Sequence, residues 1–129
     1  MLPERRVHTT LPVANLEQAR AYWEGRLGFR PFLVLPSVIL YSAGEGSVFA
    51  VSKTQARPSG AHTQMAFVVP DVEAEVAELA AAGVVFESYD LPGLRTVNGI
   101  AEMDAGRAAW FKDPSGNLIA VLEAVRPAT

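Results

Sequence analysis

The sequence predicts an α+β fold made of two copies of one βαβββ module. The first observation is a repeat: the segment HTTLPVANLE, which begins at His8, reappears as QMAFVVPDVE from Gln64. Each copy continues with apolar residues at helical spacing, a glycine and several short apolar runs that are typical of strands. The third observation is a second echo, in which FAV at 49–51 corresponds to IAV at 119–121.

A single short linker separates the two copies. Residues 57–60, with the sequence RPSG, combine proline and glycine near the centre of the chain. This segment is too short to suggest two independent domains. We therefore interpret residues 1–129 as one domain made of repeat module 5–56 and repeat module 61–125.

Composition excludes several classes of protein. Half of the 129 residues are hydrophobic and 19% are charged, which favours a folded domain over disorder. The net charge is −3 and no basic cluster is visible, so we expect neither a nucleic-acid nor a membrane-surface partner. No apolar run approaches the roughly 20 residues of a membrane span, and no signal peptide is evident. Cysteine is absent, which fits a reducing compartment and leads us to expect a cytoplasmic protein.

The first module opens with an alternating strand at residues 7–13. Its expected core face comprises Val7, Thr9, Leu11 and Val13, and the opposite face comprises His8, Thr10 and Pro12. Asn15 is a suitable helix N-cap, Trp23 lies on the apolar stripe that we expect in the core, and Gly28 follows at a C-cap position. Three short strands are expected next, at 29–35, 38–42 and 47–52.

The second module repeats this order. We expect a strand at 63–69, a helix capped by Asp71 and ended by Gly83, and a tight turn organised by Asp113 in the segment DPSGN. Further strands are expected at 84–89, 97–103, 107–111 and 117–123. Residues 90–99 form the longest irregular stretch of this half, and we expect them to be a mobile flap.

Four motifs together resemble the vicinal oxygen chelate superfamily, which includes glyoxalases, fosfomycin- and bleomycin-resistance proteins and extradiol dioxygenases. These motifs are HTTLPV from His8, the helix ending YW…LGF at 22–29, AFVVPDV from Ala66, and FKDPSGNLI from Phe111. The resemblance covers nearly the whole chain. It implies a curved mixed sheet around a central cavity with the helices on its outer face, and it also implies a homodimer.

The resemblance also identifies four positions that hold a metal ion in metal-dependent members. They are His8 and Gln64 on the first strands and Ala50 and Ala120 on the last strands. Because alanine has no donor, we expect no tightly bound metal, although a divalent ion held by His8 and Gln64 is possible. His62 and Glu102 are the alternative donors, whereas Glu123 has the wrong strand parity relative to Ala120.

Several other side chains are candidates for the wall of the cavity. The aromatic and sulfur-containing ones are Tyr41, Tyr89, Trp110 and Met103, together with Phe32 and Phe86. Trp110 and Phe111 are neighbours on one strand, so one of them must face inward and the other outward. Arg95 or Arg107 could bind an anionic group of a ligand, although a solvated arginine is the simpler interpretation.

These residues predict a protein that binds a small apolar or aromatic molecule, with His8, Gln64, His62, Tyr41, Tyr89, Trp110, Met103 and Arg95 as ligand contacts. The alternative is an enzyme of the same superfamily, a lyase, isomerase or dioxygenase. It would use either a divalent metal or His8 as a metal-free base. A small scaffold with a vestigial pocket is the third possibility.

Overall fold

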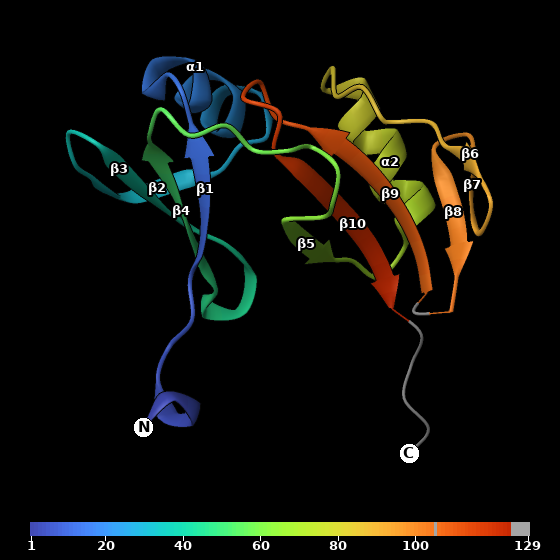
Figure 1. The fold of residues 1–129 in the computed structure, drawn as a ribbon, viewed down its shortest axis with the longest axis horizontal. Helices are drawn as coiled ribbons and strands as arrows, with labels where there is room; N and C mark the ends of the chain where they lie inside the picture. Colours follow the sequence, from blue (N-terminus) through green and yellow to red (C-terminus); the bar gives the residue numbers. More distant parts are fainter. Residues whose placement is uncertain (105, 125–129) are drawn as a thin grey trace. The chain divides into compact units, whose positions relative to one another are not determined.

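The computed structural model describes residues 1–104 and 106–124, and these residues form two compact units that meet in the chain between Pro58 and Ser59 (Figure 1). Each unit contains a mixed β-sheet and a helix that follows its first strand. The α+β class predicted from the repeat is therefore confirmed. Within the described ranges no helix is long and apolar enough to cross a membrane.

Unit 1 contains a four-stranded sheet in the order β1-β4-β3-β2. Its strands are β1 (Thr9–Val13), β2 (Arg30–Val34), β3 (Val38–Ser42) and β4 (Val48–Lys53). β1 runs parallel to β4, and the other two pairs are antiparallel. A 3-10 turn, η1 (Leu2–Glu4), precedes the sheet and another, η3 (Gly44–Gly46), joins β3 to β4.

The helical segment of unit 1 changes character along its length. α1 (Leu16–Arg20) begins at the predicted cap, where the Asn15 side chain accepts the N–H of Gln18 at 2.9 Å. It continues as a π-helical segment, η2 (Ala21–Arg26). One regular helix was the expectation from the sequence. The structure instead widens the last turns, where the N–H of Leu27 donates to the carbonyl of Tyr22.

Four aromatic rings make the core of unit 1 on the helix-covered side of its sheet. Trp23 lies 5.1 Å from Phe49 and 5.7 Å from Phe29 between ring centroids, and Tyr41 lies 5.4 Å from Phe49. Trp23 and Tyr41 are both fully buried. The prediction that Trp23 is a core residue is confirmed, whereas Val7 is 87% exposed and precedes β1 instead of facing the core.

A polar network closes this core. The buried Tyr41 hydroxyl donates to Glu24 Oε2 at 2.8 Å, and Arg20 donates to both oxygens of the same carboxylate, at 2.7 and 3.1 Å. The hydrogen bond from Arg20 lowers the pKa of Glu24 below its ordinary value. Burial, followed by the bond to this carboxylate, raises the pKa of Tyr41, which therefore stays protonated.

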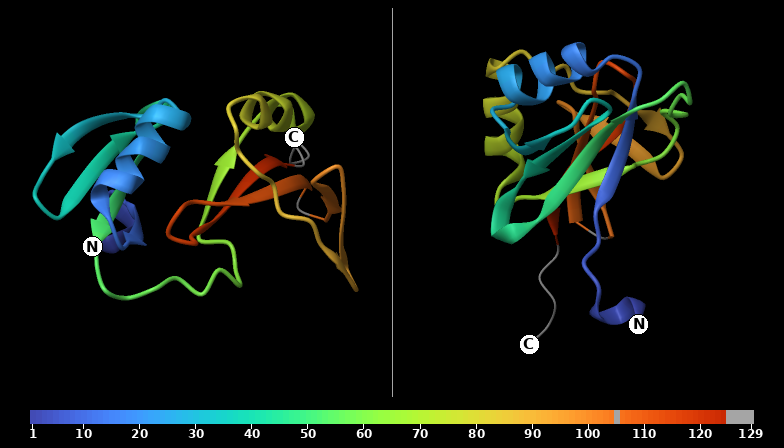
Figure 2. Two further views of the ribbon diagram at one scale, coloured as in Figure 1. Left: turned by 90° about the horizontal axis from the view of Figure 1, so that it is seen from above. Right: turned by 90° about the vertical axis from the view of Figure 1, so that its left-hand side faces the viewer.

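Unit 2 contains a six-stranded sheet in the order β5-β10-β9-β8-β7-β6. Its strands are β5 (Met65–Val68), β6 (Asp90–Leu91), β7 (Leu94–Val97), β8 (Ile100–Met103), β9 (Gly106–Lys112) and β10 (Leu118–Ala124). α2 (Val72–Ala81) packs on β9 and β10 and covers one face of this sheet (Figure 2). The Asp71 carboxylate accepts the N–H of Ala74 at 3.2 Å, which confirms the predicted cap.

Three expectations for unit 2 were wrong. The expected strand at 97–103 is interrupted by a turn at Asn98 and Gly99, which separates β7 from β8. Residues 84–89 do not form a strand, and only Phe86 makes an isolated bridge to Phe111. Residues 90–99 are not an irregular flap, because β6 and β7 pair there around a turn at Pro92 and Gly93. A strand needs a partner for its backbone groups, and the local sequence does not reveal which segment will find one.

The hydroxyl of Tyr41 gives a stability prediction for unit 1. Tyr41→Phe should lower the free energy of unfolding by about 1.5 kcal/mol at neutral pH, because a hydrogen bond to a charged acceptor is lost. Folding lowers the pKa of Glu24 below its ordinary value of 4.5. The carboxylate therefore stabilises the fold fully above pH 4.5, and this contribution is lost as the pH falls below that value. The difference between wild type and variant in urea unfolding should therefore shrink in acid. A difference that is independent of pH would contradict the role of the carboxylate.

Candidate functional site

The register of unit 2 separates its sheet into two faces. Glu123 and Arg107 lie opposite each other on β10 and β9, and both face α2: Glu123 accepts the N–H of Val72 and Arg107 pairs with Glu73. Ala120 is three residues from Glu123 and therefore faces the other way. The face without the helix is the candidate site.

Small side chains make the floor of this face. Ala120 lies between Ala66 of β5 and Trp110 of β9, and Ala108 lies next to Ala101 of β8. We call these four alanines, Ala66, Ala101, Ala108 and Ala120, the alanine floor. Ala66 is exposed, whereas the other three are buried in one cluster with Trp110. The floor is therefore apolar, and it is open along β5.

Trp110 is the largest side chain on this face. Its indole N–H donates to the Thr63 hydroxyl at 3.0 Å, and its ring meets the Tyr89 ring edge-on with centroids 5.7 Å apart. The indole polar group is thus satisfied, and the two rings hold each other at a fixed angle. The alternation on β9 is resolved: Trp110 faces the alanine floor, and Phe111 lies on the helix side against Phe86.

A hollow of about 520 Å³ adjoins Tyr89. It is lined by Tyr89, Arg95, Thr96, Ser88 and Asp90. Burial, with a smaller contribution from Glu87, raises the pKa of Tyr89, so its hydroxyl is neutral near pH 7. Arg95 is exposed and pairs with Asp90 at 3.1 Å, which leaves this rim with balanced charge. The structure thus brings Trp110 and Tyr89 together among the predicted contacts, whereas Arg95 only lines the hollow beside Tyr89.

The four aligned metal positions do not fit a divalent ion. Ala50 and Ala120 present methyl groups at the centres of their strands. The amide of Gln64 is already used, because its oxygen accepts the N–H of Leu118 at 3.0 Å and its nitrogen donates to Asn117 at 2.7 Å. Among these four residues only His8 can offer a nitrogen ligand, and one imidazole does not make a metal site.

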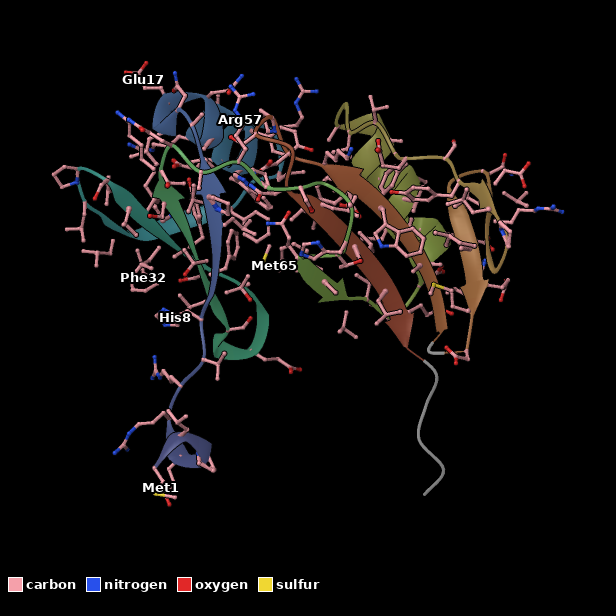
Figure 3. The ribbon with its side chains drawn as sticks, in the orientation of Figure 1. Met1, His8, Glu17, Phe32, Arg57 and Met65 are labelled. Carbon is pink, nitrogen blue, oxygen red and sulfur yellow. The ribbon has the colours of Figure 1, made fainter. Side chains whose placement is uncertain are left out.

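The two histidines lie outside the strands. His8 is exposed where the chain enters β1, at the end of unit 1 away from α1 (Figure 3). His62 is exposed in the segment before β5, with its Nδ1 atom 3.2 Å from the Ser59 hydroxyl. Residues 1–104 and 106–124 contain no group of three or more His, Asp or Glu that could hold a metal ion.

The remaining predicted residues differ in their relation to the alanine floor. Tyr41 belongs to the aromatic core of unit 1, so it is not part of this site. Met103 lies two residues from Ala101 and therefore on the same face of the sheet, where it is 42% exposed at the end of β8. Glu102 lies on the α2 side, where it pairs with Arg107 at 3.1 Å, so it does not replace a donor beside Ala120. Thr63, which accepts the Trp110 indole N–H, was not predicted as a site residue. The sequence indicated only that it lies two residues before Met65 on an alternating segment.

A second hollow, of about 1150 Å³, lies on the opposite face between α2 and β6–β8. Its walls are mainly apolar, from Val76, Ala80 and Ile100. Its charged side chains are already paired, Arg107 with Glu73 and Glu102, and Arg95 with Asp90. It is larger than the hollow beside Tyr89, but each of its charged side chains already has an ion-pair partner, so volume alone does not make it the candidate site.

Sequence comparison assigns the family. The family described as the Glyoxalase/Bleomycin resistance protein/Dioxygenase superfamily matches residues 5–121. This match covers most of both units and agrees with the resemblance carried by the repeated motifs. No curated protein matches the chain.

Solved structures show the same fold at low sequence identity. The bleomycin-binding protein of Streptomyces verticillus, solved with copper(II)-bleomycin, is 22% identical with a TM-score of 0.70, covering 94% of this chain and 98% of that one. TnmS3, an antibiotic binding protein from Streptomyces sp. CB03234, is 19% identical with a TM-score of 0.63, covering 95% and 98%. The fosfomycin resistance protein FosX from Listeria monocytogenes is 16% identical with a TM-score of 0.69, covering 95% and 94%.

The position of Gln64 gives a prediction that separates a structural role from a ligand-binding one. Gln64→Ala should lower the free energy of unfolding by about 1–3 kcal/mol, because the N–H of buried Leu118 loses its acceptor. The matched control is His62→Ala, an exposed change that should stay within about 0.5 kcal/mol of wild type. Urea unfolding of both variants measures the difference, and equal stability of the two would contradict the structural role of Gln64.

Proposed function

Because this chain belongs to the glyoxalase, bleomycin resistance protein and dioxygenase superfamily, we propose that it binds a small apolar or aromatic molecule on the Trp110 face of unit 2. The observation that carries this proposal is the arrangement of Trp110. Its ring is fixed by Thr63 and Tyr89 beside the alanine floor, on the strand next to Ala120. The superfamily alone does not select a ligand, since one fold hosts many activities.

The physical chemistry of this face favours a flat, weakly charged ligand. Alanine methyl groups let a ring approach the strands closely, and an indole beside them adds a large apolar contact. Burial of apolar ligand surface would supply most of the binding free energy, at roughly 25 cal/mol per Å². The Tyr89 hydroxyl at the neighbouring hollow is the polar group that would orient the ligand, because the Thr96 hydroxyl is already bonded to the backbone of Tyr89.

We propose that binding needs no tightly bound metal ion. The support is the chemistry of the donor set, in which Ala50 and Ala120 have no donor and the Gln64 amide is used by Leu118 and Asn117. Sequestration of a toxic compound would fit this proposal, because it needs complementary shape and no reaction. Two of the similar structures are of proteins named for binding bleomycin or an antibiotic, which supports a binding role.

The proposal also includes a cytoplasmic homodimer. A lack of cysteine suits a reducing compartment, and the resemblance to the superfamily implies two copies. The alternative function is an enzyme that uses His8 or a metal ion, and the experiments below distinguish it from the binding role.

Trp110 is the residue whose replacement tests the proposal. Anilinonaphthalenesulfonate, a flat aromatic probe, should bind wild type, and Trp110→Ala should weaken its binding at least about tenfold. Trp110→Phe retains a ring and should weaken it less. Fluorescence titration of the probe gives both dissociation constants.

The matched control is the other tryptophan. Trp23 is buried in the core of unit 1, so Trp23→Phe should leave the affinity for the probe unchanged. Equal affinities of wild type and Trp110→Ala, with both proteins folded by circular dichroism, would rule out binding at this face.

Metal analysis tests the second part of the proposal. Protein purified without chelators should contain well under one equivalent of zinc, manganese or iron, and EDTA should leave the affinity for the probe unchanged. The reason is that two of the four aligned positions are methyl groups. Stoichiometric metal that EDTA removes, measured by mass spectrometry of the elements, would favour the enzyme.

A further inference from the structure

The hollow between α2 and β6–β8 has apolar walls on two sides. Figure 1 shows α2 next to these strands within unit 2. The apolar side chains that line the hollow include Val76, Ala77 and Ala80 of α2, and Val97 and Ile100 of the strands. Its volume of about 1150 Å³ is close to the upper end of the range for small-molecule sites. A concave apolar surface of this size suits the body of a small molecule.

Strand alternation places this hollow on the helix-covered face of the sheet. Val97 lies opposite Ile100, and Glu102, two residues further along β8, lies opposite Arg107. The side chains of these four residues are therefore directed to the same side as α2. Trp110 is three residues from Arg107 on β9 and is directed to the other side. The hollow is thus separate from the Trp110 face.

Carboxylates outnumber guanidinium groups in this hollow. Glu73, Asp90 and Glu102 line it, together with Arg95 and Arg107, which leaves one negative charge in excess. The wider surroundings have the same sign, because residues 59–124 contain ten aspartate and glutamate residues and three arginine and lysine residues. A concave surface with apolar walls focuses such a field on a bound ion. The charge of the hollow therefore favours a positively charged ligand.

Arg107 is surrounded by carboxylates. Its Nη2 atom pairs with Glu73, its Nε atom lies 3.1 Å from Glu102 Oε1, and Glu123 lies opposite it on β10. The hydrogen bond to Glu73, with smaller contributions from Glu102 and Glu123, raises the pKa of Arg107 above its ordinary value. An anionic ligand would have to displace one of these carboxylates from Arg107. Both ion pairs use the Oε1 atoms, so the Oε2 atoms of the exposed Glu73 and Glu102 side chains can face a cation.

We propose that this hollow is a second binding site and that its ligand is a hydrophobic cation, a molecule whose amine or other cationic centre is attached to an apolar body. The apolar body lies against Val76, Ala80 and Ile100, and the positive charge lies near Glu73 and Glu102. Burial of apolar surface supplies the affinity, and the carboxylates select the sign of the charge. This site does not depend on the ligand of the Trp110 face.

Two ions of nearly the same shape and opposite charge test the class of ligand. Tetraphenylphosphonium should bind wild type at least about tenfold more tightly than tetraphenylborate, as measured by isothermal titration calorimetry in sodium buffer. The affinity for the cation should fall as the salt concentration rises, because salt screens the exposed carboxylates. Equal affinities for the two ions, a preference for tetraphenylborate, or binding of neither ion would overturn the proposal.

Substitutions on α2 test the location of the site. Ala80→Arg places a positive charge in the hollow and should weaken tetraphenylphosphonium binding at least about tenfold. The matched control is Ala82→Arg, at the exposed C-terminal end of α2 and outside the lining of the hollow, which should leave the affinity unchanged. Circular dichroism checks that both variants are folded. Wild-type affinity in Ala80→Arg, or an equal loss in both variants, would overturn the location.

Substitution of single carboxylates tests the role of charge. Glu102→Gln should weaken tetraphenylphosphonium binding about threefold, because an exposed charge next to the ligand is removed. Its control is Glu78→Gln, an exposed change on α2 outside the lining of the hollow, which should have a smaller effect. Equal effects of the two changes would contradict the selection of the cation by the hollow. If Trp110→Ala alone abolishes binding of the cation, the cation occupies the Trp110 face and the proposal is wrong.

Discussion

The hydrogen-bonded register of β10 is the constraint on which the candidate site depends. β10 runs parallel to β5 and antiparallel to β9, so Ala120 is fixed between Ala66 and Trp110. The same alternation turns Glu123 to the other face, where its carboxylate accepts the N–H of Val72 at the start of α2. A register shift of one residue would turn the alanines toward α2 and would turn Glu123 away from the N–H of Val72. The register of β10 therefore determines both the anchoring of α2 and the composition of the open face.

Two copies of one module have acquired different interiors. Both begin with a strand, a capping Asn15 or Asp71 and a helix. In unit 1 the helix-covered side is an aromatic core sealed by the Tyr41 hydroxyl on Glu24. In unit 2 the largest aromatic pair, Trp110 and Tyr89, lies on the open face instead. The repeat therefore preserves the backbone plan while the side chains that fill it differ.

Methyl groups at the strand centres change the chemistry that such a sheet can host. A carboxylate there would need a cation or hydrogen-bond donors to compensate its burial, whereas Ala120 is buried without such a requirement. The polar side chains nearby already have hydrogen-bond partners: Trp110 bonds to Thr63, and Gln64 bonds to the Asn117 side chain and to the backbone N–H of Leu118. An apolar surface bordered by satisfied polar groups binds ligands mainly through shape and desolvation. This is the physical basis for preferring a binding role.

The sequence by itself determined the features that depend on near neighbours. These are the two repeats, the caps at Asn15 and Asp71, the ends at Gly28 and Gly83, and the turn in which Asp113 accepts the N–H groups of Ser115 and Asn117. Only the tertiary structure decided which strands found partners and which side of each sheet the helix covers. Alternation divides a strand into two sets of side chains but does not say which set the helix buries, so the side that Tyr41 faces could not be predicted. The hydrogen bond between Gln64 and Asn117 could not be predicted either, because the two residues are 53 positions apart in the chain.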